Sequence, residues 1–211
     1  MSEPEPERGT DADAASRFAD DPVMGCLEAE YGPVDLQEAM YDDEFERIVV
    51  SVINQSISTA SANAVRERVY DALDDDITPA NVLATDEAVL VDAGLGKQKT
   101  GYVRNIAEAF EERSYSRDTL GDHDDEAVVD LLTEIRGVGE WTARMYLLFA
   151  LGREDVFPVG DLAVRRAIEE LYGEMTRAEM VEFAERWAPY RSYATVLLWR
   201  WYEDDERAPL A

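Results

Sequence analysis

The sequence has 211 residues, 46% of them hydrophobic, and a formal net charge of −27, which provides enough apolar content to bury the core of one domain or of two small lobes. It shows no apolar run long enough to cross a bilayer and no signal-peptide pattern, so we expect a cytoplasmic location without membrane association. Because Cys26 and His123 are the only residues of their types, the sequence excludes a four-cysteine iron–sulfur cluster and gives no support for a zinc site.

The pattern along the chain is almost entirely helical. Residues 1–19 are acidic, contain proline and have few large apolar side chains, so we expect a disordered tail ahead of a core at 20–211. Thr78 before Pro79, and Thr176 with Glu179, are favourable helix starts. Because no alternating strand pattern is present, we predict an all-α fold. Apolar spacing predicts helices at about 21–31, 35–41, 43–55, 58–74, 79–84, 86–93, 98–114, 124–135, 139–151, 161–172, 177–188 and 190–203.

Two of these predicted helices are joined by a glycine hairpin. Residues 131–151 have helical apolar spacing on both sides of Gly137 and Gly139. These glycines permit positive φ and a close approach of a ligand to the backbone, and the second helix begins with backbone N–H groups that lack helical acceptors, up to Thr142. A helix-hairpin-helix of this kind suits a DNA phosphate.

Four segments, in order and in register, resemble the helix-hairpin-helix DNA glycosylases, specifically the alkylated-purine branch called 3-methyladenine DNA glycosylase II. They are FERIVVSVINQSISTASA at 45–62, AGLGKQKTGYVRNIAEAF at 93–110, GVGEWTA at 137–143 with Asp161 beyond it, and PYRSYATVLLWRW at 189–201. The hairpin alone would be weak support, because ligases, polymerases and helicases also use it. The resemblance spans about 22–203 and implies a two-lobed fold with interleaved lobes, without the N-terminal β domain of larger members.

The resemblance implies that Asp161 is the catalytic carboxylate. Cleavage of a base from deoxyribose develops positive charge on the sugar, which a fixed carboxylate stabilises while it orients or deprotonates water. A purine alkylated at N3 or N7 is already cationic and leaves easily, so the site needs no obvious general acid. An aspartate before LAVRRAIEELYG is also a favoured helix N-cap, and the two roles can coexist.

Trp141 bears on the type of reaction. Relatives that also nick the strand carry a lysine nucleophile at this position, and an indole has no amine, so the resemblance implies a hydrolase without lyase activity. It also implies a base pocket with Trp141, Trp199 and Met145, in which electron-rich rings attract a cationic base. Met145 stands where close relatives have a tyrosine. The alternative for both tryptophans is a place in the core at helical spacing.

Further contacts with DNA are implied around the hairpin. The resemblance places Gln55 and Ser56 in a loop that fills the space of a base rotated out of the duplex; the alternative is a polar loop between two helices. The same resemblance assigns a phosphate to the backbone N–H groups of Gly137, Gly139 and Thr142. It also assigns a structural K⁺ or Na⁺ ion to the backbone carbonyls of Thr133, Ile135 and Val138.

Charge patterning is compatible with a DNA partner. Lys97 and Lys99 are the only lysines and acids are spread over all surface segments, a bias typical of proteins from a salt-loaded cytoplasm, such as those of halophilic archaea. At molar salt the Debye length is about 3 Å, so net charge hardly acts at a distance. Residues 136–166 contain five arginines and four acids, so Arg136 and Arg165 are predicted to face DNA. The alternative is that these arginines pair with acids on exposed helices.

The resemblance therefore implies a monomeric enzyme that requires no cofactor and starts base excision repair by hydrolysing the N-glycosidic bond of alkylated purines, such as 3-methyladenine and 7-methylguanine, in double-stranded DNA. One alternative is a glycosylase for a deaminated or mismatched base. Another is a non-catalytic DNA-binding module in which Asp161 is only a helix cap. A bifunctional lyase is disfavoured by Trp141.

Overall fold

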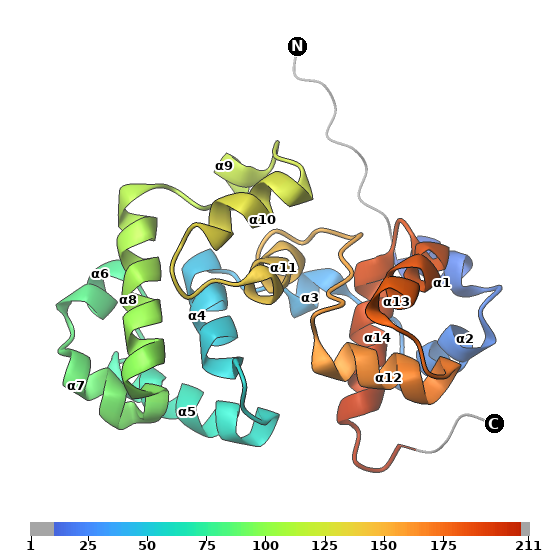
Figure 1. The fold of residues 1–211 in the computed structure, drawn as a ribbon, viewed down its shortest axis with the longest axis horizontal. Coiled ribbons are helices and arrows are strands. Elements are labelled where there is room, and N and C mark those ends of the chain that lie inside the picture. Colours follow the sequence, from blue (N-terminus) through green and yellow to red (C-terminus); the bar gives the residue numbers. More distant parts are fainter. Residues whose placement is uncertain (1–10, 208–211) are drawn as a thin grey trace. The chain divides into compact units, whose positions relative to one another are not determined.

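The computed structural model describes residues 11–207 and is all-α, with no β-strand among these residues (Figure 1). No helix of this part of the chain is long and apolar enough to span a membrane. The α-helices are α1 Asp11–Phe18, α2 Pro22–Tyr31, α3 Leu36–Ala39, α4 Glu44–Asn54, α5 Thr59–Ala72, α6 Pro79–Ala84, α7 Glu87–Leu90, α8 Gly96–Glu112, α9 Arg117–Leu120, α10 Asp125–Thr133, α11 Glu140–Phe149, α12 Leu162–Tyr172, α13 Arg177–Ala184 and α14 Arg191–Glu203; a π-helix, η1 Val91–Leu95, and a 3₁₀-helix, η2 Glu185–Trp187, complete the order.

The chain divides into two compact units. Unit 1 consists of Met1–Ala39 together with Arg153–Ala211, and unit 2 consists of Met40–Gly152. Unit 2 is therefore one continuous stretch between the two parts of unit 1. Helices α4 to α11 belong to unit 2, whereas α1 to α3 and α12 to α14 belong to unit 1.

The core of unit 2 is built around α4. This helix begins after Asp43, whose carboxylate accepts a hydrogen bond of 2.7 Å from the backbone N–H of Glu46. Phe45 and all residues from Arg47 to Ile53 are buried, and Ile48, Val52 and Ile53 are completely so. A helix that is buried over most of its surface needs neighbours on several faces, and α4 lies between α8 and α11, which it contacts (Figure 1).

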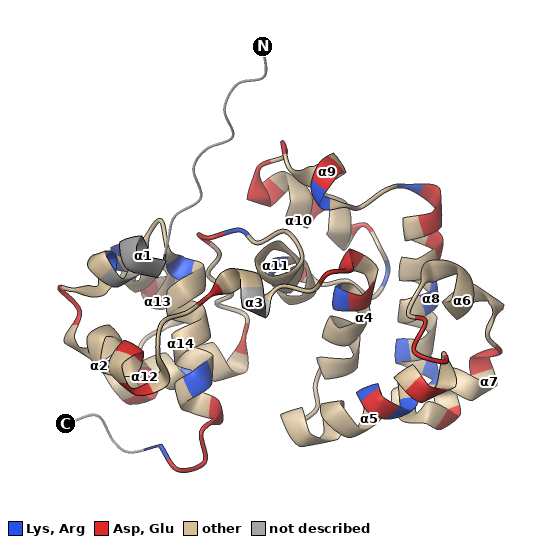
Figure 2. Cartoon of the chain, turned by 180° about the vertical axis from the view of Figure 1, so that it is seen from behind, with Lys and Arg blue, Asp and Glu red and all other residues tan. Residues whose placement is uncertain are grey.

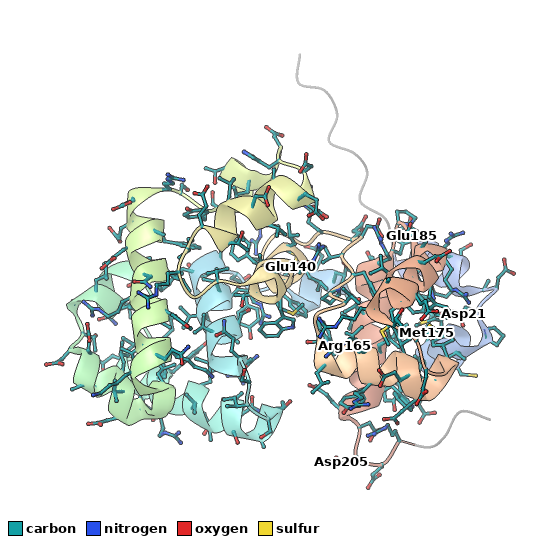
Figure 3. All side chains as sticks on the ribbon, in the orientation of Figure 1. Asp21, Glu140, Arg165, Met175, Glu185 and Asp205 are labelled. Carbon is teal, nitrogen blue, oxygen red and sulfur yellow. The ribbon has the colours of Figure 1, made fainter. Side chains whose placement is uncertain are left out.

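The core of unit 1 surrounds α14, which packs against α2 and α12. The Asp21 carboxylate (labelled in Figure 3) connects three parts of this unit. It caps α2, and it accepts hydrogen bonds from the Tyr172 hydroxyl at 3.0 Å and from the Trp187 indole N–H at 3.0 Å. Burial is the main cause, with the neighbouring carboxylate, of a raised pKa for Tyr172. A buried carboxylate with several donors is satisfied by hydrogen bonds, and its role is structural.

Most helix starts agree with those that the sequence predicts. The Thr78 hydroxyl accepts from the backbone N–H of Asn81 at 3.3 Å, directly before Pro79. Thr176 and Glu179 form a reciprocal capping box at α13. These interactions satisfy donors that would lack a partner at the first turn of a helix.

The structure differs from the sequence prediction at the start of the chain. Residues predicted as a disordered tail form α1 from Asp11 to Phe18, and the side chains of Ala14 and Phe18, one helical turn apart, are both 2% exposed. Burial of this pair against the rest of unit 1 stabilises a helix in a stretch of low overall hydrophobicity. The rest of the predicted tail, residues 1–10, lies outside the described residues.

Candidate functional site

The hairpin of unit 2 connects α10, which ends at Thr133, to α11, which begins at Glu140. Gly137 has φ of +111°, a backbone conformation that glycine adopts without strain. Gly139 is the N-cap of α11 and provides no side chain to cap it. The first turn of α11 therefore presents backbone N–H groups with positive partial charge, next to a residue that adds no side-chain bulk.

Side chains of α8 hold the hairpin in place. A Cβ atom at Gly137 would lie 2.4 Å from Cγ of Tyr102, so the tyrosine ring rests directly against the hairpin backbone. One turn further along α8, the Asn105 amide donates to the carbonyl of Arg136 at 3.0 Å. The sequence reasoning did not single out these two residues. The signal that could have found them is their spacing of three residues within the segment 93–110, which places both on one face of a helix.

Gln55 connects the end of α4 to the same hairpin. Its side-chain amide donates to the carbonyl of Gly137 at 3.1 Å and to the hydroxyl of Thr142 at 3.0 Å. The Lys99 ammonium donates to the carbonyl of Ile53 at 2.7 Å, and burial lowers the pKa of Lys99. The side chain predicted to contact DNA at position 55 is therefore engaged within unit 2. Its contact with DNA stays a prediction, as does that of Ser56.

Asp161 lies in unit 1, at the start of α12. Its Oδ1 accepts hydrogen bonds from the backbone N–H of Val164 at 3.0 Å and from the indole N–H of Trp199 at 3.0 Å. The guanidinium of Arg165 donates to the Asp161 backbone carbonyl at 3.3 Å (Arg165 is labelled in Figure 3). The structure thus confirms that Asp161 caps the helix, and it brings Trp199 and Arg165 to the same residue.

The three residues of the predicted base pocket and the predicted catalytic aspartate are divided between the two units. Trp141 and Met145 lie on α11 of unit 2, and Met145 is 2% exposed within the core of that unit. Asp161 and Trp199 lie in unit 1. Trp141 and Trp199 are both half-buried. The grouping of these side chains around a base stays a prediction.

Four of the five arginines between 136 and 166 fall into two groups. Arg144 pairs with Glu140 at 3.1 Å and with Glu126 at 3.3 Å, and Arg166 pairs with Glu169 at 2.8 Å. For Arg144 and Arg166 the structure therefore agrees with the alternative that these arginines pair with acids on the helix surface. Arg136 is exposed and Arg165 is half-buried, and neither forms an ion pair within residues 11–207.

The hairpin carbonyls are the remaining predicted ligands. The carbonyl of Ile135 accepts the backbone N–H of Val138 at 3.0 Å, which closes a turn and leaves the oxygen a second lone pair. Within the described residues, no group of three or more His, Cys, Asp or Glu side chains is arranged to hold a metal ion. A cation at this place would depend on backbone oxygens, which suits K⁺ or Na⁺ and stays a prediction.

The chain belongs to the HhH-GPD superfamily of base excision DNA repair proteins, which it matches over residues 49–189. It is 26% identical to the alkylbase DNA glycosidase-like protein mag2 of Schizosaccharomyces pombe, over 85% of this chain and 86% of that protein. It is also similar to the solved structure of a DNA-3-methyladenine glycosidase from Bacillus halodurans, with a TM-score of 0.75, 28% identity and coverage of 94% and 93% of the two chains.

A further solved structure shares the fold at lower identity. It is the 3-methyladenine DNA glycosylase Mag1 of Schizosaccharomyces pombe in complex with abasic DNA, with a TM-score of 0.83, 24% identity and coverage of 92% of this chain and 98% of that one. These likenesses confirm the family and the all-α fold class that the sequence predicts.

Proposed function

We propose that this protein is a monofunctional DNA glycosylase that hydrolyses the N-glycosidic bond of alkylated purines in double-stranded DNA and so starts base excision repair. The observation that carries the proposal is the Asp161 carboxylate, held at the start of α12 by a backbone N–H and an indole N–H, in a chain of the HhH-GPD superfamily. The names of its relatives, an alkylbase DNA glycosidase-like protein and a DNA-3-methyladenine glycosidase, support the class of substrate.

The proposed chemistry needs one fixed negative charge. When the bond between C1′ of the sugar and the base nitrogen breaks, its electron pair leaves with the base and neutralises a cationic alkylpurine. Positive charge remains on the sugar, and the Asp161 carboxylate stabilises it. A water oxygen then bonds to C1′, and its proton passes to the carboxylate or to solvent. The donors at Oδ1 from Val164 and Trp199 fix the orientation of the carboxylate before the reaction.

The proposed contacts with DNA use the hairpin. A phosphate binds the N–H groups of Gly137, Gly139 and Thr142, and the helix dipole of α11 favours its negative charge. A K⁺ or Na⁺ ion at the carbonyls of Thr133, Ile135 and Val138 would hold the turn, without a part in the reaction. The enzyme is proposed to act as a monomer, because flipping one nucleotide requires only one such site. Its proposed location is the cytoplasm.

The test is release of free base from a panel of duplexes in molar potassium chloride. One duplex carries 3-methyladenine and 7-methylguanine, one carries uracil or hypoxanthine, and one carries a mismatch. Chromatography of the released material should show methylated purines only. Release of a deaminated or mismatched base in their place would overturn the substrate class, and binding without any release would indicate a DNA-binding module. Borohydride should trap no protein on the DNA; a trapped adduct would indicate a lyase.

A further inference from the structure

The loop between α4 and α5 exposes an uncharged surface in an otherwise highly charged chain. No Asp, Glu, Lys or Arg occurs from Ile48 to Val65, and residues 56–61 are all exposed. Figure 2 draws this stretch in the tan of uncharged residues, between the charged first turn of α4 and the charged remainder of α5. A surface that carries no carboxylates can approach a polyanion without the repulsion that the rest of the chain would experience.

Ile57 is the large apolar side chain of this loop and is 39% exposed. Among the described residues of unit 2, only Val89 on α7 shares this property, at 44%. An exposed isoleucine is unremarkable by itself. Its neighbours make the difference, because Ser56 and Ser58 are small and leave the isoleucine as the bulkiest group of the loop.

The two residues before Ile57 are poorly suited to enter DNA. Gln55 uses its amide on the hairpin, at Gly137 and Thr142. Ser56 has φ of +58°, a conformation uncommon outside glycine, and its side chain is short. Withdrawal of Gln55 would break two hydrogen bonds, and Ser56 would leave most of the space of a base unfilled.

Both ends of the loop are anchored. Lys99 donates to the carbonyl of Ile53 at the end of α4. At the other end, Ser58 caps α5 by accepting from the backbone N–H of Ser61 at 3.3 Å. Ile57 therefore projects from a short segment whose flanks are held by hydrogen bonds, and a side chain on such a segment loses little conformational freedom when it inserts.

We propose that Ile57 is the side chain that enters the duplex beside the extruded nucleotide, and that Gln55 is a positioning residue that ties this loop to the phosphate-binding hairpin. The proposal rests on the proposed function, since it requires a DNA partner. An apolar wedge between base steps unstacks them and occupies the vacated space. Because Gln55 bonds to Gly137 and Thr142, the phosphate contact and the wedge move as one body of unit 2.

The test uses fluorescence of 2-aminopurine placed next to a tetrahydrofuran abasic analogue in a duplex, with the full chain in molar potassium chloride. Unstacking by the wild-type protein should raise the fluorescence on saturable binding. Ile57→Ser should reduce this rise at saturation by about tenfold, since no side chain then holds the bases apart. Val89→Ser, the matched exposed apolar residue of the same unit, should give the wild-type rise.

Gln55→Glu tests the positioning role separately. The carboxylate has the shape of the amide but cannot donate to the Gly137 carbonyl or the Thr142 hydroxyl. We expect weaker binding of the same duplex, by about tenfold, with the full fluorescence rise once the protein is saturated. If Gln55 itself were the wedge, the rise at saturation would persist in Ile57→Ser.

A wild-type rise that Ile57→Ser retains would overturn the assignment of Ile57, and so would saturable binding by the wild type without any rise. Neither outcome bears on base release, because the abasic analogue has no base to lose. The wild-type assay for released bases therefore tests the proposed function independently. Circular dichroism of each variant establishes that it remains folded, so a loss of fluorescence cannot be attributed to unfolding.

Discussion

Asp161 has a structural and a proposed chemical role in one side chain. Its Oδ1 receives both the cap hydrogen bond from Val164 and the indole hydrogen bond from Trp199. Substitutions that keep the cap can therefore be separated from those that change the charge. The hydrogen bond from the Trp187 indole to Asp21 offers a comparison with that from Trp199 to Asp161, because its acceptor is a buried carboxylate in the core of unit 1.

Trp199→Phe and Trp187→Phe form a matched pair. Trp199→Phe removes the donor to Asp161, and we expect base release to slow on the order of tenfold, with little loss of stability because residue 199 is only half-buried. Trp187→Phe removes a donor to a buried carboxylate, and we expect the free energy of unfolding to fall by about 2 kcal/mol. Denaturant unfolding and single-turnover base release measure the two effects. Equal losses of stability in both variants would make Trp199 a core residue.

Gly137 and Gly139 should respond differently to alanine. At Gly137 the φ of +111° and the contact with Tyr102 both oppose a Cβ, so Gly137→Ala should destabilise the protein by about 2 to 4 kcal/mol. At Gly139 a Cβ would meet nothing within 4 Å, and φ is −99°. Gly139→Ala should cost no more than about 1 kcal/mol as a poorer N-cap.

Gly139→Ala separates the effect on folding from the effect on DNA binding. The Gly139 methyl group would project where a phosphate is expected to approach the start of α11, so affinity for duplex DNA should fall about tenfold although the protein stays folded. Anisotropy titration in molar potassium chloride measures this. Unchanged affinity in Gly139→Ala would place the phosphate elsewhere.

At the level of elements, the sequence predicted most helices because local signals and tertiary packing agree. The periodic apolar residues of α4 and α12, and the capping residues Thr78 and Thr176, act over one or two turns. The prediction failed at α1 and missed α9. Both are short helices, of eight and four residues, whose stability depends on contacts that no local pattern contains.

The candidate site was predictable to a similar extent. The glycine hairpin and the Asp161 cap depend on residue type and spacing, and both are present in the structure. The hydrogen bond of Gln55 to Gly137 and the contact of Tyr102 with Gly137 join residues 82 and 35 positions apart in the chain, respectively. Such long-range contacts follow from packing, so the sequence pattern could not reveal them.

The capping box of α13 should make stability depend on pH. Hydrogen bonds from the backbone N–H of Thr176, and then from its hydroxyl, lower the pKa of Glu179. A carboxyl with a lowered pKa in the folded state contributes stability that is fully present above its usual pKa of about 4.5 and is lost as pH falls through the folded value. Glu179→Gln should therefore be less stable than wild type at pH 7, with a smaller difference at pH 4.

Denaturant unfolding at fixed high salt measures this difference. Glu182→Gln, an exposed position on the same helix, controls for the removal of one negative charge. A gap between Glu179→Gln and wild type that stays constant from pH 7 to pH 4 would contradict the account of the capping box.

For the whole molecule, the dominant property is the net charge of −27. Self-repulsion of this size destabilises a compact state at low salt. Screening shortens from a Debye length of about 10 Å at 0.1 M salt to about 3 Å at 1 M. The same screening permits an acidic protein to approach DNA, with the exposed, uncharged residues 56–61 of unit 2 as a surface of low repulsion.

We therefore expect salt to stabilise the protein. The melting temperature followed by circular dichroism should rise by several degrees or more between 0.1 and 1 M potassium chloride. Binding of duplex DNA should weaken less steeply with salt than it does for basic proteins, because repulsion is screened along with attraction. Sucrose at matched osmolality controls for general stabilisation. A melting temperature that does not change with salt would contradict this view of the composition.

The measurement that tests the central claim most directly compares wild type with Asp161→Asn on methylated duplex DNA in molar potassium chloride. Asparagine retains an oxygen that can accept from Val164 and Trp199 and is itself a favoured N-cap, so the variant should fold and bind DNA like the wild type. We predict that wild type releases 3-methyladenine or 7-methylguanine and that the variant releases it at least about a hundredfold more slowly. Equal release by the two proteins would contradict the assignment of Asp161, and absence of release by folded, DNA-bound wild type would contradict the proposed function.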